Sequence, residues 1–185
     1  MTSMTSIDKL SALGNFQKFV EAYIDYPVDY ALVNSIRDNK CTVDYFYDDD
    51  TILAFLCWYV LNSTNQTIAV VVPRYNPDIN HRLCQIIDRV ADDFQYHFVK
   101  EWNQSSIKLK NGCYIKIGNH PNYFRGTSIG LIFLYRAFEC DTDNLDAIVS
   151  CLLPAMRVQT RKVIVQVDML RENGHVQLLK SYGIE

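Results

Sequence analysis

Short apolar runs alternate along this chain with longer segments that have the hydrophobic period of a helix. Residues 67–72 form a nearly continuous run of Ile, Ala and Val, which is typical of a strand buried on both faces. Residues 79–90 then place Ile, Leu and Val at helical spacing. Alternation of this kind predicts βαβ units and a mainly parallel sheet with helices on both faces. The predicted fold class is therefore α/β.

The rest of the pattern divides into helices and strands of ordinary length. Helices are predicted at residues 16–24, 27–38, 51–61, 145–156 and 175–181, the second of them opened by Pro27. Strands are predicted at residues 41–47, 131–135 and 162–167. Asn111 and Gly112, between residues 106–110 and 113–117, form a strong hairpin signal. We therefore expect one antiparallel β-hairpin, near residues 105–118, inserted in the parallel sheet.

The size and charge of the chain narrow its class further. Its 185 residues are 49% hydrophobic, which is enough for one buried core. We expect a single domain over residues 1–185, in which residues 1–12 are flexible and residues 13–38 form a helical N-terminal extension. The net charge is −3, with the acidic excess in the first half. This charge argues against a strongly basic nucleic-acid coat protein but allows a local basic patch in the second half.

The six cysteines are scattered and contain no C-x-x-C pair. We interpret them as small buried hydrophobic residues of a protein in a reducing cytosol. No segment has the length and apolar character of a membrane span, and the N-terminus does not have the pattern of a signal peptide. We expect an intracellular protein with no membrane partner.

The turn after the strand predicted at residues 41–47 is the first candidate for a ligand site, because ligands of α/β sheets bind beyond the carboxyl ends of the strands. A phosphate-binding loop would have the pattern G-x-x-x-x-G-K-[ST] here, with backbone N–H groups and a lysine facing the phosphates. The chain instead has Asp48, Asp49 and Asp50, followed by Thr51. We interpret the aspartates as caps of the next helix. A divalent cation held by the same carboxylates is the alternative.

Three stretches in the second half of the chain have recognisable patterns. Residues 101–117 have the sequence EWNQSSIKLKNGCYIKI, residues 124–129 are FRGTSI, and residues 161–165 are RKVIV. In this order, they resemble the W-N-x-x-S-I-x-L-x-N-G-S-x-I hairpin, the R-G-x-S segment and the strand before the coupling motif of the ATPase domain of tailed-phage large terminases. These terminases are DNA-packaging motors. The resemblance covers residues from about 30 to 180 and implies a RecA-like fold of the P-loop NTPase type.

The positions that this resemblance assigns to catalysis differ from the family pattern. Asp49, Asp50 and Thr51 stand where the family has Gly-Lys-Thr, and Tyr135 and Arg136 stand where it has adjacent acidic residues for Mg²⁺ and for the attacking water. Residues 166–168 replace the Thr-rich coupling motif. We therefore interpret the following residues as a degenerate nucleotide site with no catalytic residue, metal or cofactor: Asp48, Asp49, Asp50, Thr51, Tyr135 and Arg136.

Basic residues of the hairpin form a second candidate site. Lys108, Lys110 and Lys116 alternate with apolar residues, so one face of the hairpin is predicted to be cationic. Arg125 belongs to the R-G segment. A solvated strand face is the structural explanation of this pattern, and contact with DNA or with a protein partner is the functional one.

The resemblance implies a phage-encoded, catalytically inactive protein of the host cytoplasm. It would bind a terminase subunit, the portal or DNA, and would modulate genome packaging. Since the chain ends at Glu185, the nuclease domain of the family would be missing. One alternative is an interaction protein that blocks a host or competitor factor. The other is a metal- or nucleotide-dependent enzyme, for which a cluster of at least three of these carboxylates would be required: Asp48, Asp49, Asp50, Glu139 and Asp141.

Overall fold

A six-stranded sheet forms the centre of the computed structural model, which describes residues 13–74, 76–94, 106–126, 128–156, 161–168 and 174–184. The strand order is β1-β6-β5-β2-β4-β3. The strands are β1 (Cys41–Asp44), β2 (Thr67–Val71), β3 (Ser106–Lys108), β4 (Tyr114–Gly118), β5 (Ile129–Leu134) and β6 (Val163–Gln166). Neighbouring strands are parallel except β3 and β4, which form an antiparallel hairpin. The predicted α/β class and the inserted hairpin are confirmed.

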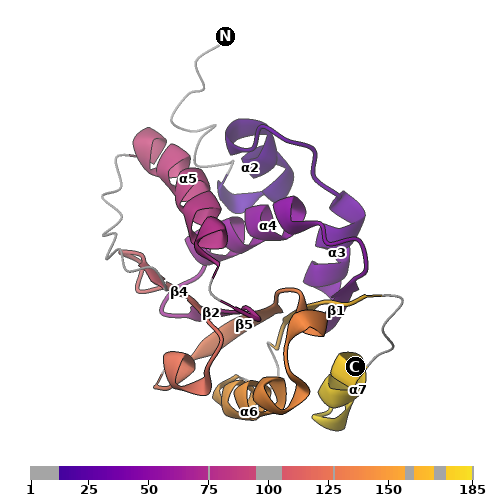
Figure 1. Cartoon of the computed structure of the whole chain (residues 1–185). Helices are drawn as coiled ribbons and strands as arrows, with labels where there is room; N and C mark the ends of the chain where they lie inside the picture. The colour runs from indigo at the N-terminus through magenta and orange to yellow at the C-terminus, as the bar shows by residue number, and fades with distance from the viewer. Residues whose placement is uncertain are drawn as a thin grey trace.

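Helices cover both faces of this sheet (Figure 1). One face is covered by α2 (Phe16–Tyr23), α3 (Tyr30–Asp38), α4 (Asp49–Leu61) and α5 (Pro77–Phe94), and the other by α6 (Thr142–Leu152) and α7 (Gly174–Ser181). Strand β2 shows how one strand serves both layers, because successive side chains point to opposite faces. Ile68 and Val70 belong to the core under α4, whereas Ala69 and Val71 belong to the core under α6.

Helix α4 is the central helix of the first layer. Every residue from Thr51 to Cys57 is buried, as expected of a helix that is apolar on all sides. It packs against α2, α3 and α5, so residues 13–38 contribute to the same core as the sheet. The indole N–H of Trp58 donates a hydrogen bond to the carbonyl of Leu13 at 2.8 Å. This bond connects α4 to the segment that precedes α2.

Several elements have different ends from those predicted. Helix α3 begins at Tyr30 and not at Pro27, because Asp29 is its N-cap and accepts hydrogen bonds from the N–H groups of Ala31 and Leu32. Strand β1 ends at Asp44, whose carboxylate accepts from the N–H groups of Phe46 and Asp48 and turns the chain. Helix α6 ends at Leu152 and continues as a short 3₁₀ turn, η3 (Leu153–Ala155). Two further 3₁₀ turns are η1 (Pro121–Phe124) and η2 (Ala137–Glu139).

The hairpin turn is tied to the C-terminal end of α4. The N–H of Gly112 donates to the carbonyl of Leu109 at 3.1 Å, and the N–H of Leu109 donates to the carbonyl of Cys113 at 2.9 Å. Gly112 has φ +79°, the left-handed conformation that closes a three-residue hairpin loop. The side-chain amide of Asn111 donates to the carbonyls of Val60 and Ser63 at 2.8 and 3.0 Å. The Asn-Gly pair therefore fixes both the turn and its position on α4.

All six cysteines are free thiols. The prediction that they are buried hydrophobic residues is confirmed for Cys57, Cys84 and Cys113, whereas the other three are half-buried. Within the described ranges, no helix is both long and apolar enough to cross a membrane. The flexible tail predicted at residues 1–12 lies outside the described residues.

Candidate functional site

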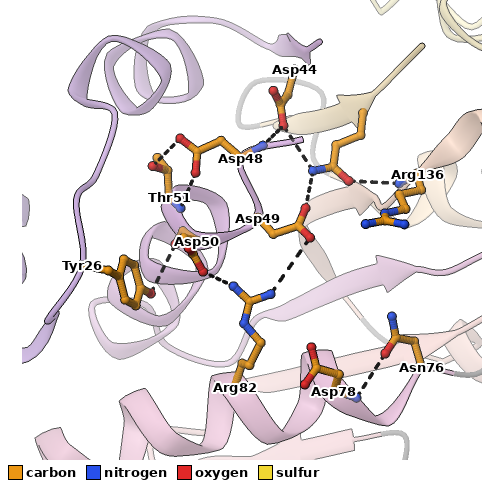
Figure 2. A network of polar contacts seen from close by, with 11 residues as sticks. Tyr26, Asp44, Asp48, Asp49, Asp50, Thr51, Asn76, Asp78, Arg82 and Arg136 are labelled. Carbon is orange, nitrogen blue, oxygen red and sulfur yellow. Dashed lines mark hydrogen bonds and ion pairs between the residues drawn. The ribbon is translucent and has the colours of Figure 1, made fainter. Parts of the chain in front are cut away.

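Three parallel strands end at one edge of the sheet, beside the N-terminus of α4. Asp44 at the end of β1 pairs in register with Gln166 at the end of β6, and β5 leads directly into Tyr135 and Arg136. The carboxyl ends of neighbouring parallel strands meet in this way in α/β sheets. The structure thereby brings the aspartates of the α4 N-terminus together with Arg136 (Figure 2).

Asp48 is the N-cap of α4, as predicted, whereas Asp49 and Asp50 form its first turn, so the helix begins two residues before the predicted Thr51. Its carboxylate accepts a hydrogen bond from the N–H of Thr51 at 3.0 Å and a second from the Thr51 hydroxyl at 2.7 Å. The hydroxyl oxygen in turn accepts from the N–H of Asp29 at 2.8 Å. Thr51 is 0% exposed. Thr51 is the residue that the resemblance places at the threonine of Gly-Lys-Thr. Its hydroxyl group links α4 to the start of α3.

Gln166 connects the strand ends to the helix. Its amide nitrogen donates to Asp44 Oδ2 at 3.1 Å and to Asp49 Oδ1 at 2.7 Å. Its amide oxygen accepts from the backbone N–H of Arg136 at 3.1 Å. Gln166 is 0% exposed, and these three bonds satisfy the polar groups of its side chain. Sequence reasoning included Gln166 only as part of a replaced motif and missed this role.

Arg82 of α5 supplies positive charge to the same site. Its guanidinium forms an ion pair with Asp50 and lies 4.0 Å from Asp49 Oδ2. The side chain of Arg82 is 28% exposed and that of Asp49 only 16%, so water screens this interaction incompletely. Arg82 was not among the predicted site residues, because 32 positions separate it from Asp50 and no local pattern links them.

Burial dominates the electrostatics of Asp49. Desolvation raises its pKa, while the hydrogen bond from Gln166 and the charges of Arg136 and Arg82 act in the opposite direction. The pKa of Tyr135 is also raised, first by burial and then by the charge of Asp49, to which its hydroxyl is hydrogen-bonded. Tyr135 is 7% exposed. It therefore serves Asp49 as a neutral hydrogen-bond donor.

Arg136 and two acidic residues that follow it, Glu139 and Asp141, also come after the carboxyl end of β5. Arg136 has φ +46°, its guanidinium carbon lies 5.3 Å from the Tyr135 ring centroid, and it forms an ion pair with Glu139 at 3.7 Å. Glu139 belongs to η2, and Asp141 is the N-cap residue of α6. In the part of the chain that the structure describes, no three Asp, Glu, His or Cys residues are grouped so as to hold a metal ion. The described carboxylates therefore do not form the cluster that a metal-dependent enzyme would require.

The basic residues of the hairpin lie apart from this network. Ile107 and Ile115 are paired and buried, whereas Lys108 and Lys116 lie on the opposite face of the two strands. Lys108 Nζ lies 5.4 Å from the Tyr114 ring centroid. The predicted alternation is confirmed for Lys108 and Lys116, whereas Lys110 lies in the turn between the strands; Lys110 and Arg125, which follows η1, are exposed. Their contact with DNA or a partner stays a prediction.

Solved structures with a similar fold include the following two. The ATPase domain of the large terminase of Thermus phage P74-26 matches with a TM-score of 0.58 and 13% identity, over 80% of this chain and 67% of that domain. A point mutant of the same domain matches with a TM-score of 0.58 and 12% identity, over 82% of this chain and 69% of that one. Neither models of known protein families nor curated proteins match the chain.

At this level of identity, the likeness establishes the fold. The chain has the RecA-like α/β fold of terminase ATPase domains, with a mostly parallel sheet between two layers of helices. This confirms the fold that the sequence motifs implied.

Proposed function

We propose that this chain is a pseudo-ATPase, a catalytically inactive phage relative of the terminase ATPase domain. The observation that supports this proposal is the composition of the α4 N-terminus. In P-loop proteins, the corresponding helix presents free N–H groups and a lysine to the phosphates. In this chain, Asp48 caps the helix, and Asp49 and Asp50 lie in its first turn with Arg82 beside them.

The magnitudes of the charge effects support exclusion of a triphosphate. A helix N-terminus stabilises an anion by about 0.3–1 kcal/mol at an exposed site. A phosphate oxygen about 4 Å from one carboxylate would be repelled by about 4 kcal/mol at the effective dielectric constant of a protein surface. Arg82 is already paired with Asp50. We infer that the protein's own carboxylates take the place of the phosphates, with Arg82 beside them.

A protein of this kind acts through its surface and not through turnover. The exposed cations Lys110 and Arg125, with Lys108 and Lys116 on the sheet face, are the proposed contact region. The structural neighbours are parts of large terminases. We therefore propose that the chain binds a terminase subunit, the portal or DNA in the host cytoplasm and modulates packaging.

Phosphate release from ATP, measured with and without duplex DNA, tests the inactive state. The proposal predicts no release above the buffer rate in either condition, because the described site offers no lysine or metal-binding cluster to the phosphates. Sustained DNA-stimulated release that disappears on heat denaturation of the protein would contradict it.

Fluorescence anisotropy with a labelled duplex tests the contact region. The double variant Lys110→Ala with Lys116→Ala is expected to bind several-fold more weakly and to show a shallower salt dependence, because it loses phosphate contacts. The double variant Lys40→Ala with Lys180→Ala removes the same charge elsewhere and is the control. If neither duplex DNA nor purified terminase and portal proteins bind the wild-type chain, the proposed role is wrong.

A further inference from the structure

A pocket of about 300 Å³ opens beside the acidic network, between α3 and the loop that follows β1. Asp29, Asp44 and Asp48 line it, together with the apolar residues Leu32, Val43 and Phe46. Asp44 and Asp48 also belong to the network in Figure 2. The pocket therefore combines a strongly acidic side with an apolar side.

The three carboxylates receive hydrogen bonds from neutral groups. Asp29 accepts from two backbone N–H groups of α3, and Asp48 accepts from the N–H and the hydroxyl of Thr51. Asp44, which is 3% exposed, accepts from two backbone N–H groups and from the Gln166 amide. None of the three forms an ion pair with a described residue.

The positive ends of the helices offset only part of this charge. Asp29 and Asp48 each cap a helix, and a helix N-terminus is equivalent to about half a positive charge. Two such ends balance roughly one of the three negative charges. The pocket is therefore anionic. Since no three described carboxylates are grouped closely enough to share one metal ion, the fitting ligand is a cation that spreads its charge over several donors.

Two aromatic side chains lie at the rim of this pocket. Phe46 is 82% exposed and Tyr45 is 42% exposed, although large apolar side chains are normally covered. The Asp44 carboxylate accepts from the N–H groups of Phe46 and Asp48, each at 2.9 Å, and so positions the backbone of the loop that carries the two aromatic residues. Exposed aromatic rings gathered beside a pocket are typical of a protein-binding surface.

We propose that this pocket binds a segment of a partner protein in which an arginine side chain lies next to an apolar one. A guanidinium presents five donors in a planar fork, pairs with carboxylates and stacks on aromatic rings. It can therefore contact the carboxylates and one rim aromatic together, which a compact ammonium group does less well. The apolar neighbour covers Phe46. This site is separate from the basic hairpin, and it does not depend on the partner being a packaging component.

A titration followed by amide NMR tests this proposal on the whole chain. The probe is the capped tripeptide N-acetyl-Leu-Arg-Leu-amide, and the control is the same peptide with citrulline, which has the shape of arginine but no charge. The expected result is saturable shifts of the Asp29, Asp44 and Phe46 amides at millimolar arginine peptide. Citrulline peptide should bind several-fold more weakly, and the difference should shrink in high salt.

Two exposed aromatic variants locate the site. Phe46→Ala should weaken binding of the arginine peptide several-fold, whereas Tyr123→Ala, which removes a ring that is 52% exposed elsewhere, should leave it unchanged. Equal binding of both peptides, shifts confined to other surfaces, or equal effects of the two variants would overturn the proposal. DNA binding and phosphate release by Phe46→Ala should match those of the wild-type chain, so failure of the pseudo-ATPase proposal would be recognised separately.

Discussion

The two ends of α4 are built on different chemistry. At the C-terminal end, carbonyl groups of the last turn accept hydrogen bonds from the side chains of Asn62, Ser63 and Asn111. At the N-terminal end, the aspartates of the first turn face Arg82 and the buried Gln166. The proposal of a degenerate nucleotide site assigns a terminase-like hairpin to the first end and replaced phosphate-binding residues to the second.

This difference separates what the fold requires from what catalysis requires. Asn111 donates to the carbonyl groups of Val60 and Ser63 at the end of α4, and these bonds stabilise the fold whether or not a nucleotide binds. At the N-terminal end, a capping side chain is sufficient for the helix, so the phosphate-binding residues can be replaced without loss of the fold. The Asn-Gly pair of this chain therefore has a structural role at the hairpin turn.

The largest expected effect on stability comes from removing the hydrogen bonds of Asn111 at the C-terminal end of α4. Asn111→Ala removes two donated hydrogen bonds and one accepted from the N–H of Cys113, so the free energy of unfolding should fall by about 3 kcal/mol. Urea denaturation measures this change. Asn144→Ala, which loses one exposed bond to the Asn119 carbonyl, should cost less than about 1 kcal/mol. Equal losses for the two variants would contradict the role of Asn111.

A second variant tests the backbone conformation and the contacts of Gly112 in the same hairpin turn. Gly112→Ala places a Cβ against the side-chain amide of Asn65 in a backbone with φ +79°, and should cost about 2 kcal/mol, of which the left-handed backbone explains about half. Gly126 also has a positive φ, of +77°, but its Cβ would meet nothing within 4 Å. Gly126→Ala should therefore lose only the backbone part. Thermal or urea unfolding that shows identical losses would exclude the contact with Asn65.

At the N-terminal end, the hydroxyl of Thr51 is expected to matter for stability. Thr51→Val removes the acceptor of the Asp29 N–H and the donor to Asp48, so the free energy of unfolding should fall by about 1.5 kcal/mol. Thr51→Ser keeps the hydroxyl and should lose about half as much, through its missing methyl group. A valine variant as stable as wild type would show that the hydroxyl has no structural role.

The smallest expected effect concerns pH. Because the pKa of Asp49 is raised above its ordinary value of 3.8 in the folded chain, the folded state binds this proton more tightly than the unfolded state does. The contribution of Asp49 to stability is therefore present below pH 3.8 and is lost as the pH rises through the raised pKa. Asp49→Asn should abolish this component in urea denaturation at mildly acidic and neutral pH. An unchanged pH profile would contradict the burial of Asp49.

Local patterns were sufficient to predict the α/β fold class and the inserted hairpin. The apolar run that forms β2 and the helical period of α5 each predict their element without knowledge of the rest of the chain, and Asn111-Gly112 predicts the hairpin. The N-cap role of Asp48 was also predictable, because the cap and the helix it closes are adjacent in sequence. The start of α3 and the end of β1 were harder to predict, because hydrogen bonds to the side chains of Asp29 and Asp44 determine them.

The contacts that define the candidate site could not be predicted in the same way. Gln166 and Asp49 are separated by 117 positions, and Arg82 and Asp50 by 32. Their proximity follows from the strand order β1-β6-β5 and from the packing of α5 on α4. A buried glutamine at the end of an apolar strand is the one local signal that such a contact exists.

Calorimetric titration of the purified chain with ATP and Mg²⁺, and with Mg²⁺ alone, tests the central claim most directly. If the carboxylates of Asp49 and Asp50 take the place of the phosphates, neither titration should give saturable heat. Saturable heat that requires ATP would show that the N-terminus of α4 admits a triphosphate, and it would contradict the assignment of this chain as a pseudo-ATPase.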